Sequence, residues 1–195
     1  MSPTPTLVFL RHGETDWNVE GRLQGQHDVP INANGRGQAK RNGEKVAREV
    51  PEALAFEFVA SPLIRARETM EIARQAMGLD PAGYRVDDRL KELTFGAWEG
   101  FTYRDIARVN AGWVAQRQAD KWLFQPPGGE SYQMLSVRIL AWLETVDRPL
   151  VVVSHGGVGR VLRAHLLKLD PLRTVIEDFP HERVFLWRDG EGRWL

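Results

Sequence analysis

The sequence predicts an α/β fold, in which helices flank a mostly parallel sheet on both faces to form a three-layer sandwich. Short apolar runs at residues 7–10, 58–61 and 150–153 have the length and composition of strands that are buried on both faces. Segments compatible with helices separate these runs, and such alternation is typical of a parallel sheet. We expect residues 1–195 to form one domain with a substantial core.

The first half of the chain alternates strand and helix twice. Residues 7–10 are the first strand, and the polar stretch from Gly35 to Val50 is compatible with a helix. Residues 58–61 are the second strand. Ser61 is expected to cap the next helix, with Pro62 at the first helical position, where its missing N–H costs nothing. Apolar side chains at spacings of three and four give this helix one buried face: Leu63, Ala66, Met70, Ala73 and Met77.

The second half is predicted to add a cover to the same sheet. Residues 84–100 are expected to form short strands and turns, and residues 101–129 a helical excursion over the sheet edge that ends in two prolines and two glycines. The remaining predicted elements are a helix at 131–146, a strand at 150–154, a helix at about 157–169 and a strand at 184–187.

Composition excludes several function classes. Lys plus Arg equals Asp plus Glu, so the formal net charge is zero and the basic excess of a nucleic-acid binder is missing. Without cysteine the chain has no disulfide, thiolate metal site or cysteine nucleophile. No signal peptide and no membrane span are expected, which favours a cytoplasmic location. Oligomeric state is not encoded, although seven tryptophans leave room for a homodimer interface.

Two His-Gly turns follow the apolar runs. Arg11-His12-Gly13 comes after residues 7–10, and Ser154-His155-Gly156-Gly157 comes after residues 150–153. Because ligands bind beyond the carboxyl ends of strands in open α/β sheets, both histidines are expected at the edge where chemistry takes place.

A third strand end contributes Arg65, one turn into the helix after residues 58–61. Arg11 and Arg65 are planar, bidentate donors that suit phosphate or carboxylate oxygens. The amides of Gly156 and Gly157 open a helix, and helix N-termini favour anions. Together these groups predict a phosphoryl pocket.

Such a pocket needs a nucleophile and a proton donor. A neutral imidazole can attack phosphorus, so His12 is the candidate nucleophile, with its other ring nitrogen expected to donate to a backbone carbonyl. Glu92 is the candidate acid because it lies in a turn-rich stretch between short strands. Glu99 is the alternative, and a solvated turn carboxylate is the simpler interpretation of either residue.

Five motifs, in order, resemble the histidine phosphatase superfamily, also called the phosphoglycerate-mutase-like family. The ordered set is far more specific than any single motif. The motifs are Arg11-His12-Gly13-Glu14-Thr15, Ser61 to Thr69, Glu92 to Gly100, Pro127-Gly128-Gly129-Glu130-Ser131 and Ser154-His155-Gly156-Gly157.

The resemblance implies a role for each matched residue. His12 becomes phosphohistidine, and Glu92 protonates the leaving oxygen and then accepts a proton from water. Oxygens of the phosphoryl group are held by Arg11, Arg65 and His155. By the same resemblance, Asn18 hydrogen-bonds the phosphate and the Gly156 amide donates to the phosphoryl group, while Gln24 and Gly25 line the substrate side of the pocket. Neither a metal nor another cofactor is implied, because arginine and histidine supply the positive charge.

The family contains both mutases and phosphatases. The excursion at 101–129 is short and the chain has no Arg-Arg dipeptide, whereas the mutases carry a longer excursion with adjacent arginines. We therefore expect a phosphomonoester phosphatase acting on a small phosphorylated metabolite. A phosphoglycerate mutase, a non-catalytic phospho-ligand binder and a metallohydrolase using His12 and His155 are the alternatives. Arg104, Arg108, Arg117 and Lys121 give the excursion a mild positive bias that could help an anionic substrate, and a solvated charged face is the simpler expectation.

Overall fold

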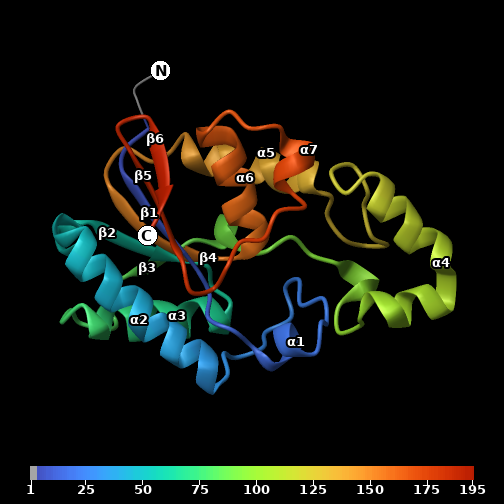
Figure 1. Ribbon diagram of the computed structural model, residues 1–195, viewed down its shortest axis with the longest axis horizontal. Helices are drawn as coiled ribbons and strands as arrows, with labels where there is room; N and C mark the ends of the chain where they lie inside the picture. Colours follow the sequence, from blue (N-terminus) through green and yellow to red (C-terminus); the bar gives the residue numbers. More distant parts are fainter. Residues whose placement is uncertain (1–3) are drawn as a thin grey trace.

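The computed structural model describes residues 4–195, which build a six-stranded sheet with helices on both sides (Figure 1). In space the strands follow the order β3-β2-β4-β1-β5-β6. The four strands from β3 to β1 are mutually parallel, whereas both pairs that involve β5 are antiparallel. The predicted mostly parallel sheet is confirmed. The strands are β1 (Leu7–Arg11), β2 (Glu57–Ala60), β3 (Arg85–Val86), β4 (Leu150–Ser154), β5 (Val184–Arg188) and β6 (Glu191–Trp194).

Helices cover both faces of this sheet, as the sequence predicted. α2 and α3 pack on one face, and α5 and α6 pack on the other. Within residues 4–195, no helix combines the length and apolar character that crossing a membrane requires. The helices are α1 (Asp16–Val19), α2 (Ala33–Glu49), α3 (Ile64–Ala76), α4 (Tyr103–Ala119), α5 (Tyr132–Leu143), α6 (Gly156–Leu166) and α7 (Pro171–Thr174).

The central strands β1 and β4 are apolar throughout because each of their faces meets a core. Along β1, Leu7 and Phe9 enter the core under α5 and α6, whereas Val8 and Leu10 enter the core under α2 and α3. This alternation follows from the two-residue period of a strand. A run without polar positions is therefore what a doubly covered central strand requires.

The start of α3 differs from the prediction. The helix begins at Ile64, and its N-cap position is Leu63, which makes no side-chain capping bond. Ser61 instead places its hydroxyl 2.7 Å from Nε2 of His155 on the neighbouring strand end. The Ser61 hydroxyl also accepts a long hydrogen bond of 3.4 Å from the Leu63 amide, in the turn before the helix. Ser61 therefore serves a buried histidine and this turn, and it is not the N-cap residue of α3.

A hairpin between β5 and β6 was missed by the sequence analysis, which predicted only the first of these strands. Asp189 and Gly190 form its turn and both have positive φ, at 52° and 84°. An Asp-Gly pair is the residue combination that such a two-residue turn favours. This signal was available in the sequence.

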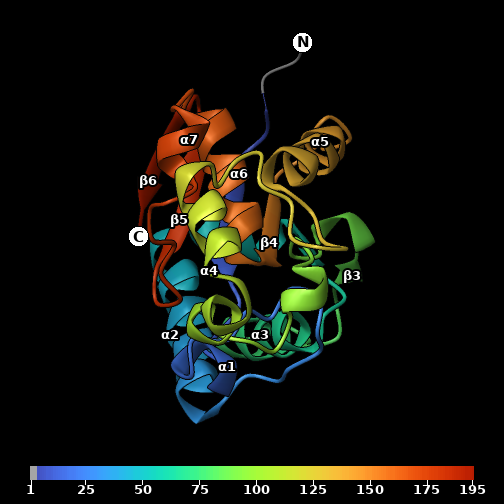
Figure 2. The same cartoon turned by 90° about the vertical axis from the view of Figure 1, so that its right-hand side faces the viewer.

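The predicted excursion contains α4 and stands apart from the sheet. Thr102 caps α4 by accepting a hydrogen bond from the Asp105 amide, and Asn110 interrupts the helix with extended backbone angles. In Figure 1, α4 lies at the far right, beyond α1 and α6. Figure 2 looks from that side and shows α4 toward the viewer.

Candidate active site

The ends of β1 and β4 bring the two His-Gly turns together. The strands pair in parallel, with Arg11 opposite Ser154, and the His12 amide donates to the Ser154 carbonyl over 2.8 Å. The rings of His12 and His155 consequently lie side by side, with centroids 5.2 Å apart. Parallel pairing of two apolar strands thus positions histidines that are far apart in the chain.

The His12 ring is held in one orientation. Its Nδ1 lies 2.8 Å from the Gly13 carbonyl oxygen, which can only accept, so Nδ1 carries the proton and Nε2 is free. Burial, assisted by the charge of Arg65, lowers the pKa of His12 well below its usual range. The side chain lines a cavity of about 200 Å³. His12 therefore presents a neutral nucleophilic nitrogen at a cavity wall.

Arg11 and Arg65 line the same cavity, and we call them the first cation group. Each is held by backbone oxygens: Arg11 Nη1 donates to Phe179 over 2.6 Å, and Arg65 donates to His27 over 2.7 Å and Gly25 over 2.6 Å. Burial lowers the pKa of each to about 10, so both stay charged at neutral pH. Each Nε is buried and without a partner among residues 4–195. Unused N–H groups on buried cations are suited to anionic oxygens.

His155 is fully buried next to His12. Its Nε2 pairs with the Ser61 hydroxyl, and its Nδ1 is buried without a partner in the described part of the chain. Burial, followed by the charge of Arg65, lowers the pKa of His155 well below its usual range. Its role in holding phosphoryl oxygens stays a prediction.

Glu92 reaches the cavity from the loop that precedes the excursion. Its carboxylate accepts from the amides of Leu93 and Gly157, both over 3.0 Å. A Cβ at position 157 would lie 2.3 Å from Oε1 of Glu92, so only glycine allows this approach. The expectation that the Gly157 amide faces an anionic ligand is therefore wrong, because that amide holds the candidate acid.

Glu99, the alternative acid, has a different environment. Its Oε1 accepts hydrogen bonds from the amides of Gln26 and Phe95, both over 3.0 Å, and from the hydroxyl of Thr94 over 2.7 Å. A carboxylate oxygen with three donors stabilises the loop around it. The geometry favours Glu92 over Glu99 as the residue that can exchange a proton with a ligand.

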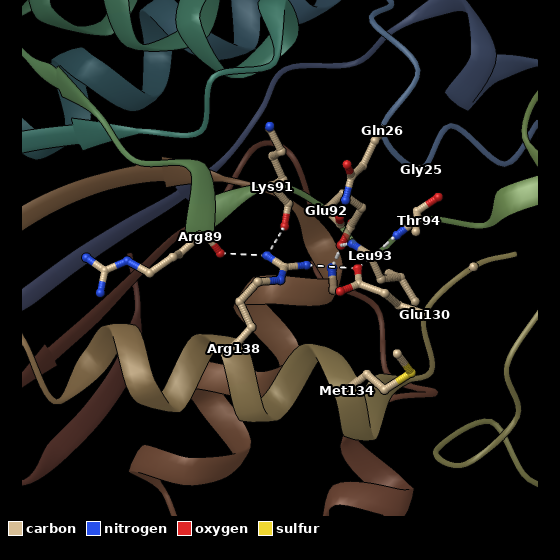
Figure 3. A network of polar contacts seen from close by, with 12 residues as sticks. Gly25, Gln26, Arg89, Lys91, Glu92, Leu93, Thr94, Glu130, Met134 and Arg138 are labelled. Carbon is tan, nitrogen blue, oxygen red and sulfur yellow. Dashed lines mark hydrogen bonds and ion pairs between the residues drawn. The ribbon is translucent and has the colours of Figure 1, made fainter.

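A polar network behind Glu92 holds its loop against α5 (Figure 3). Arg138 donates to the carbonyls of Arg89 and Lys91 over 2.6 and 2.9 Å, and to the Glu130 carboxylate over 2.9 Å. The same Glu130 oxygen accepts from the Thr94 amide over 3.1 Å. Both sides of the Glu92 loop are thus tied to one helix, which fixes where the carboxylate can point.

The predicted substrate-side residues Asn18, Gln24 and Gly25 all line the cavity. The Asn18 side-chain oxygen accepts from the amide and hydroxyl of Thr15, each over 3.0 Å, which leaves its NH₂ group available as a donor. Gly25 has φ of +51°, and a Cβ there would lie 2.0 Å from Oε1 of Glu99. That backbone conformation directs the Gly25 carbonyl to Arg65.

Gly156 opens α6 directly after His155. A Cβ at this position would lie 3.1 Å from Nη1 of Arg160 and 3.4 Å from Nε of Arg11. Gly156 thus gives two arginines room to approach each other, and its amide contact with the substrate stays a prediction.

Sequence reasoning missed Arg160, and it interpreted Arg117 and Lys121 mainly as part of a solvated face. We call these three residues the second cation group. All three line the cavity. The expected solvated face is wrong for Arg117, which is only 2% exposed, and for Lys121. Arg160 lies four residues, or one turn, beyond Gly156 at the start of α6, a spacing that could have indicated it.

His181 lies against the candidate nucleophile. Its Nδ1 donates to the His12 carbonyl over 2.6 Å, and the two rings are 5.4 Å apart. Burial, followed by the charge of Arg11, lowers the pKa of His181 to about 4. His181 is therefore a neutral donor at neutral pH and supports the His12 backbone.

The metallohydrolase alternative lacks a ligand set in residues 4–195, where no group of three or more His, Asp or Glu side chains could hold a metal ion. His12 and His155 are instead engaged with Gly13 and Ser61. Positive charge at the cavity comes from arginine and lysine.

Residues 7–181 match the histidine phosphatase superfamily, branch 1, which includes every element that borders the cavity. The chain belongs to this superfamily. A glucosyl-3-phosphoglycerate phosphatase of Mycobacterium tuberculosis (strain ATCC 25618 / H37Rv) is 37% identical over 177 residues, covering 84% of this chain and 75% of the relative. A probable phosphoglycerate mutase GpmB of Salmonella paratyphi C (strain RKS4594) is 39% identical over 156 residues, covering 77% and 69%. The relatives of this chain thus include one that is named a phosphatase and one that is named a probable mutase.

Solved structures of the superfamily share the fold. The mycobacterial glucosyl-3-phosphoglycerate phosphatase in complex with VO3 superposes with a TM-score of 0.77 at 32% identity, over 98% of this chain and 96% of that chain. A putative α-ribazole-5'-P phosphatase from Escherichia coli str. K-12 substr. MG1655 gives 0.80 at 24% identity, over 99% and 95%, which speaks for the fold alone.

Proposed function

We propose that this protein is a phosphomonoester phosphatase that acts on a small phosphorylated metabolite through a phosphohistidine intermediate. One observation carries the proposal. The neutral ring of His12, with Nε2 free, shares a cavity with two buried arginines that have unused N–H groups and with the Glu92 carboxylate. Nucleophile, anion holders and proton carrier are the parts that phosphoryl transfer needs.

In the first step, Nε2 of His12 attacks phosphorus and the bond from phosphorus to the ester oxygen breaks. Glu92, in its protonated form, donates its proton to that oxygen, so the product leaves as an alcohol. Arg11 and Arg65 bind the non-bridging oxygens, where negative charge must be stabilised in the transition state.

In the second step, water attacks the phosphorus of phosphohistidine and the phosphorus–nitrogen bond breaks. The Glu92 carboxylate accepts a proton from this water, which restores the acid, and inorganic phosphate leaves. One ester and one water thus yield one alcohol and one phosphate, with His12 and Glu92 returned to their starting states.

The short excursion at residues 101–129, which borders the cavity, favours a phosphatase over a mutase. A mutase must keep phosphohistidine from water until the phosphoryl group is returned, whereas a short cover admits water. The excursion of this chain is short and without adjacent arginines. Because one relative is named a probable phosphoglycerate mutase, mutase activity is the second candidate function for this chain.

The test is a screen of phosphomonoesters with phosphate release as the readout and His12→Ala as the blank. The panel includes glucosyl-3-phosphoglycerate, named for the mycobacterial relative, together with 3-phosphoglycerate and sugar phosphates. We expect vanadate to inhibit and EDTA to have no effect. Faster formation of 2-phosphoglycerate than of phosphate would instead establish a mutase. No turnover of any ester, with binding retained, would establish a binding protein.

A further inference from the structure

We propose that two side chains of α2, Gln38 and Asn42, are positioning residues that hold the backbone around His12 in the geometry needed for attack on phosphorus. Neither belongs to the residues that line the cavity. The inference rests on the proposed function, because it takes His12 as the nucleophile. It gives a role to a polar face of α2 that the apolar core does not explain.

This face of α2 is polar and buried. Gly35, Gln38 and Asn42 follow one another at spacings of three and four residues, so they lie on the same side of the helix. Gln38 is 6% exposed and Asn42 is 1% exposed, although amide side chains mostly lie at protein surfaces. Burying an amide is costly unless it is hydrogen-bonded. The partners of these two side chains therefore indicate what the face does.

The first turn of α2 packs directly on the backbone that follows His12. A Cβ at Gly13 would lie 2.4 Å from the Gly35 carbonyl oxygen, and a Cβ at Gly35 would lie 2.2 Å from the Glu14 carbonyl oxygen. Two glycines are therefore needed for this close approach of two backbones. The approach brings the polar face of α2 within reach of residues 13 and 14.

Gln38 holds the peptide unit that orients the His12 ring. Its Oε1 accepts a hydrogen bond of 2.9 Å from the Glu14 amide. That N–H belongs to the same planar peptide unit as the Gly13 carbonyl, whose oxygen lies 2.8 Å from Nδ1 of His12. Because the unit is rigid, holding its N–H end also holds its carbonyl end. Gln38 thus fixes the acceptor that keeps Nε2 of His12 free.

The preceding peptide unit, which joins His12 to Gly13, is held at both ends. The Gly13 amide donates to the Thr69 hydroxyl over 2.9 Å, and the His12 carbonyl accepts from Nδ1 of His181 over 2.6 Å. Nδ2 of Asn42 donates to the His181 carbonyl over 2.8 Å, which holds that residue in place. Asn42 therefore acts on His12 through His181.

The consequence for catalysis is a difference between rate and binding. Phosphoryl transfer depends mostly on positioning and electrostatic stabilisation, and a misplacement of about 1 Å can cost about 100-fold in rate. Loss of one support of a turn that keeps its other supports should cost about 10-fold in kcat. The ester is bound through Arg11 and Arg65 in the proposed function, so its KM should stay within about 2-fold.

Gln38→Met and Asn42→Leu test this expectation, because both remove the hydrogen bond and keep the approximate volume. Single-turnover phosphohistidine formation from p-nitrophenyl phosphate gives the rate at saturating ester and the ester concentration at half that rate. Gln38→Glu keeps an acceptor for the Glu14 amide and should stay within about 3-fold of the wild-type rate. Gln38→Asn, whose amide is one CH₂ shorter, is the milder variant for the case in which Gln38→Met does not fold.

Val46→Ala is the matched control for loss of stability. Val46 is fully buried one turn beyond Asn42, in the core under α2 and α3, and the substitution leaves a cavity there. We expect it to lower Tm while the rate of phosphohistidine formation stays unchanged. Wild-type rates in the folded variants of both Gln38 and Asn42 would overturn the proposal. A loss of rate in Val46→Ala as large as theirs would also overturn it.

NMR separates this inference from the proposed function. The proton on Nδ1 of His12, assigned by its absence in His12→Ala, reports the hydrogen bond to Gly13 without any turnover. We expect it to exchange faster with water in Gln38→Met and Asn42→Leu, and at the wild-type rate in Val46→Ala. That result in a protein that turns over no ester would overturn the phosphatase and retain the positioning role. Wild-type turnover with unchanged exchange in both variants would do the reverse.

Discussion

The first and second cation groups border the same cavity but depend on different parts of the chain. Arg11 ends a central strand and Arg65 lies in the first turn of α3, and both are held by backbone carbonyls. Arg117 and Lys121 come from α4 and the turn after it, and Arg117 is held by a side chain of the same excursion. Strand register therefore positions the first group. The path of the cover positions Arg117 and Lys121 of the second group, whereas its third member, Arg160, lies on α6.

We expect this difference to separate residues that the chemical step requires from residues that determine which substrate is preferred. Groups at strand ends are placed by the sheet that every member of a fold shares, so they suit the step common to many substrates. Groups on a cover can change with its length and kinks while the sheet stays intact. We expect changes near the first group to abolish turnover and changes near the second to alter which ester is preferred.

The largest effect is expected from His12→Ala. Loss of the proposed nucleophile should lower kcat by about 10⁴-fold or more on every ester. Phosphate release from p-nitrophenyl phosphate measures it, with circular dichroism to check folding. His165→Ala, at an exposed position of α6, is the control and should stay active. Turnover at the wild-type rate in His12→Ala would contradict the mechanism.

Glu92→Gln should lower the rate by about 10²- to 10⁴-fold for esters with poor leaving groups, and by less for p-nitrophenyl phosphate. The reason is that a good leaving group departs without a proton. Single-turnover measurements of phosphohistidine formation give the loss of rate on each ester, and the two losses are then compared. Glu99→Gln is the comparison, and it should reduce stability without a leaving-group dependence, since Glu99 holds a loop. Equal losses on both esters in Glu92→Gln would contradict its role as acid.

Arg138→Met tests whether the network behind Glu92 matters for catalysis. The variant leaves two loop carbonyls and Glu130 without their donor, which should lower the free energy of unfolding by about 1.5–3 kcal/mol. A displaced Glu92 should also lower kcat for poor leaving groups by about 10-fold. Arg148→Met, at an exposed ion pair, is the control and should cost about 0–1 kcal/mol. Unchanged leaving-group dependence in Arg138→Met would limit this network to a structural role.

The smallest effect concerns pH and the neutral histidines of the sheet edge. The pKa of His181 is about 4 in the folded protein, below the usual value of 6.5. Between these values the unfolded chain binds a proton that the folded protein does not, so stability falls as pH falls from 6.5 toward 4. His181→Asn should reduce this slope by about 1 kcal/mol per pH unit.

Urea unfolding at pH 7, 6 and 5 measures the slope. His12 and His155, whose pKa values are also lowered, still contribute to the pH dependence of stability in the variant. An unchanged slope in His181→Asn would show that this histidine takes up its proton alike in the folded and unfolded chain.

Much of the fold could be predicted because its signals are local. Apolar runs indicated the central strands, and the ordered motifs indicated the superfamily to which the chain belongs. The errors lie where a distant partner replaces a local one. Ser61 was expected to be the N-cap of a helix, and its shorter hydrogen bond is with His155 on another strand end. The Gly157 amide was expected to face a ligand and instead holds Glu92.

The sequence by itself determined that a histidine, an arginine and a second histidine follow two buried strands, because strand ends of a parallel sheet meet at one edge. Only the tertiary structure shows that Glu92 lines the cavity while Glu99 holds a loop, and that Arg117, Lys121 and Arg160 line the same cavity. The reason is physical. Strand position follows from hydrophobic period, whereas the direction of a loop or cover side chain follows from contacts with residues far along the chain.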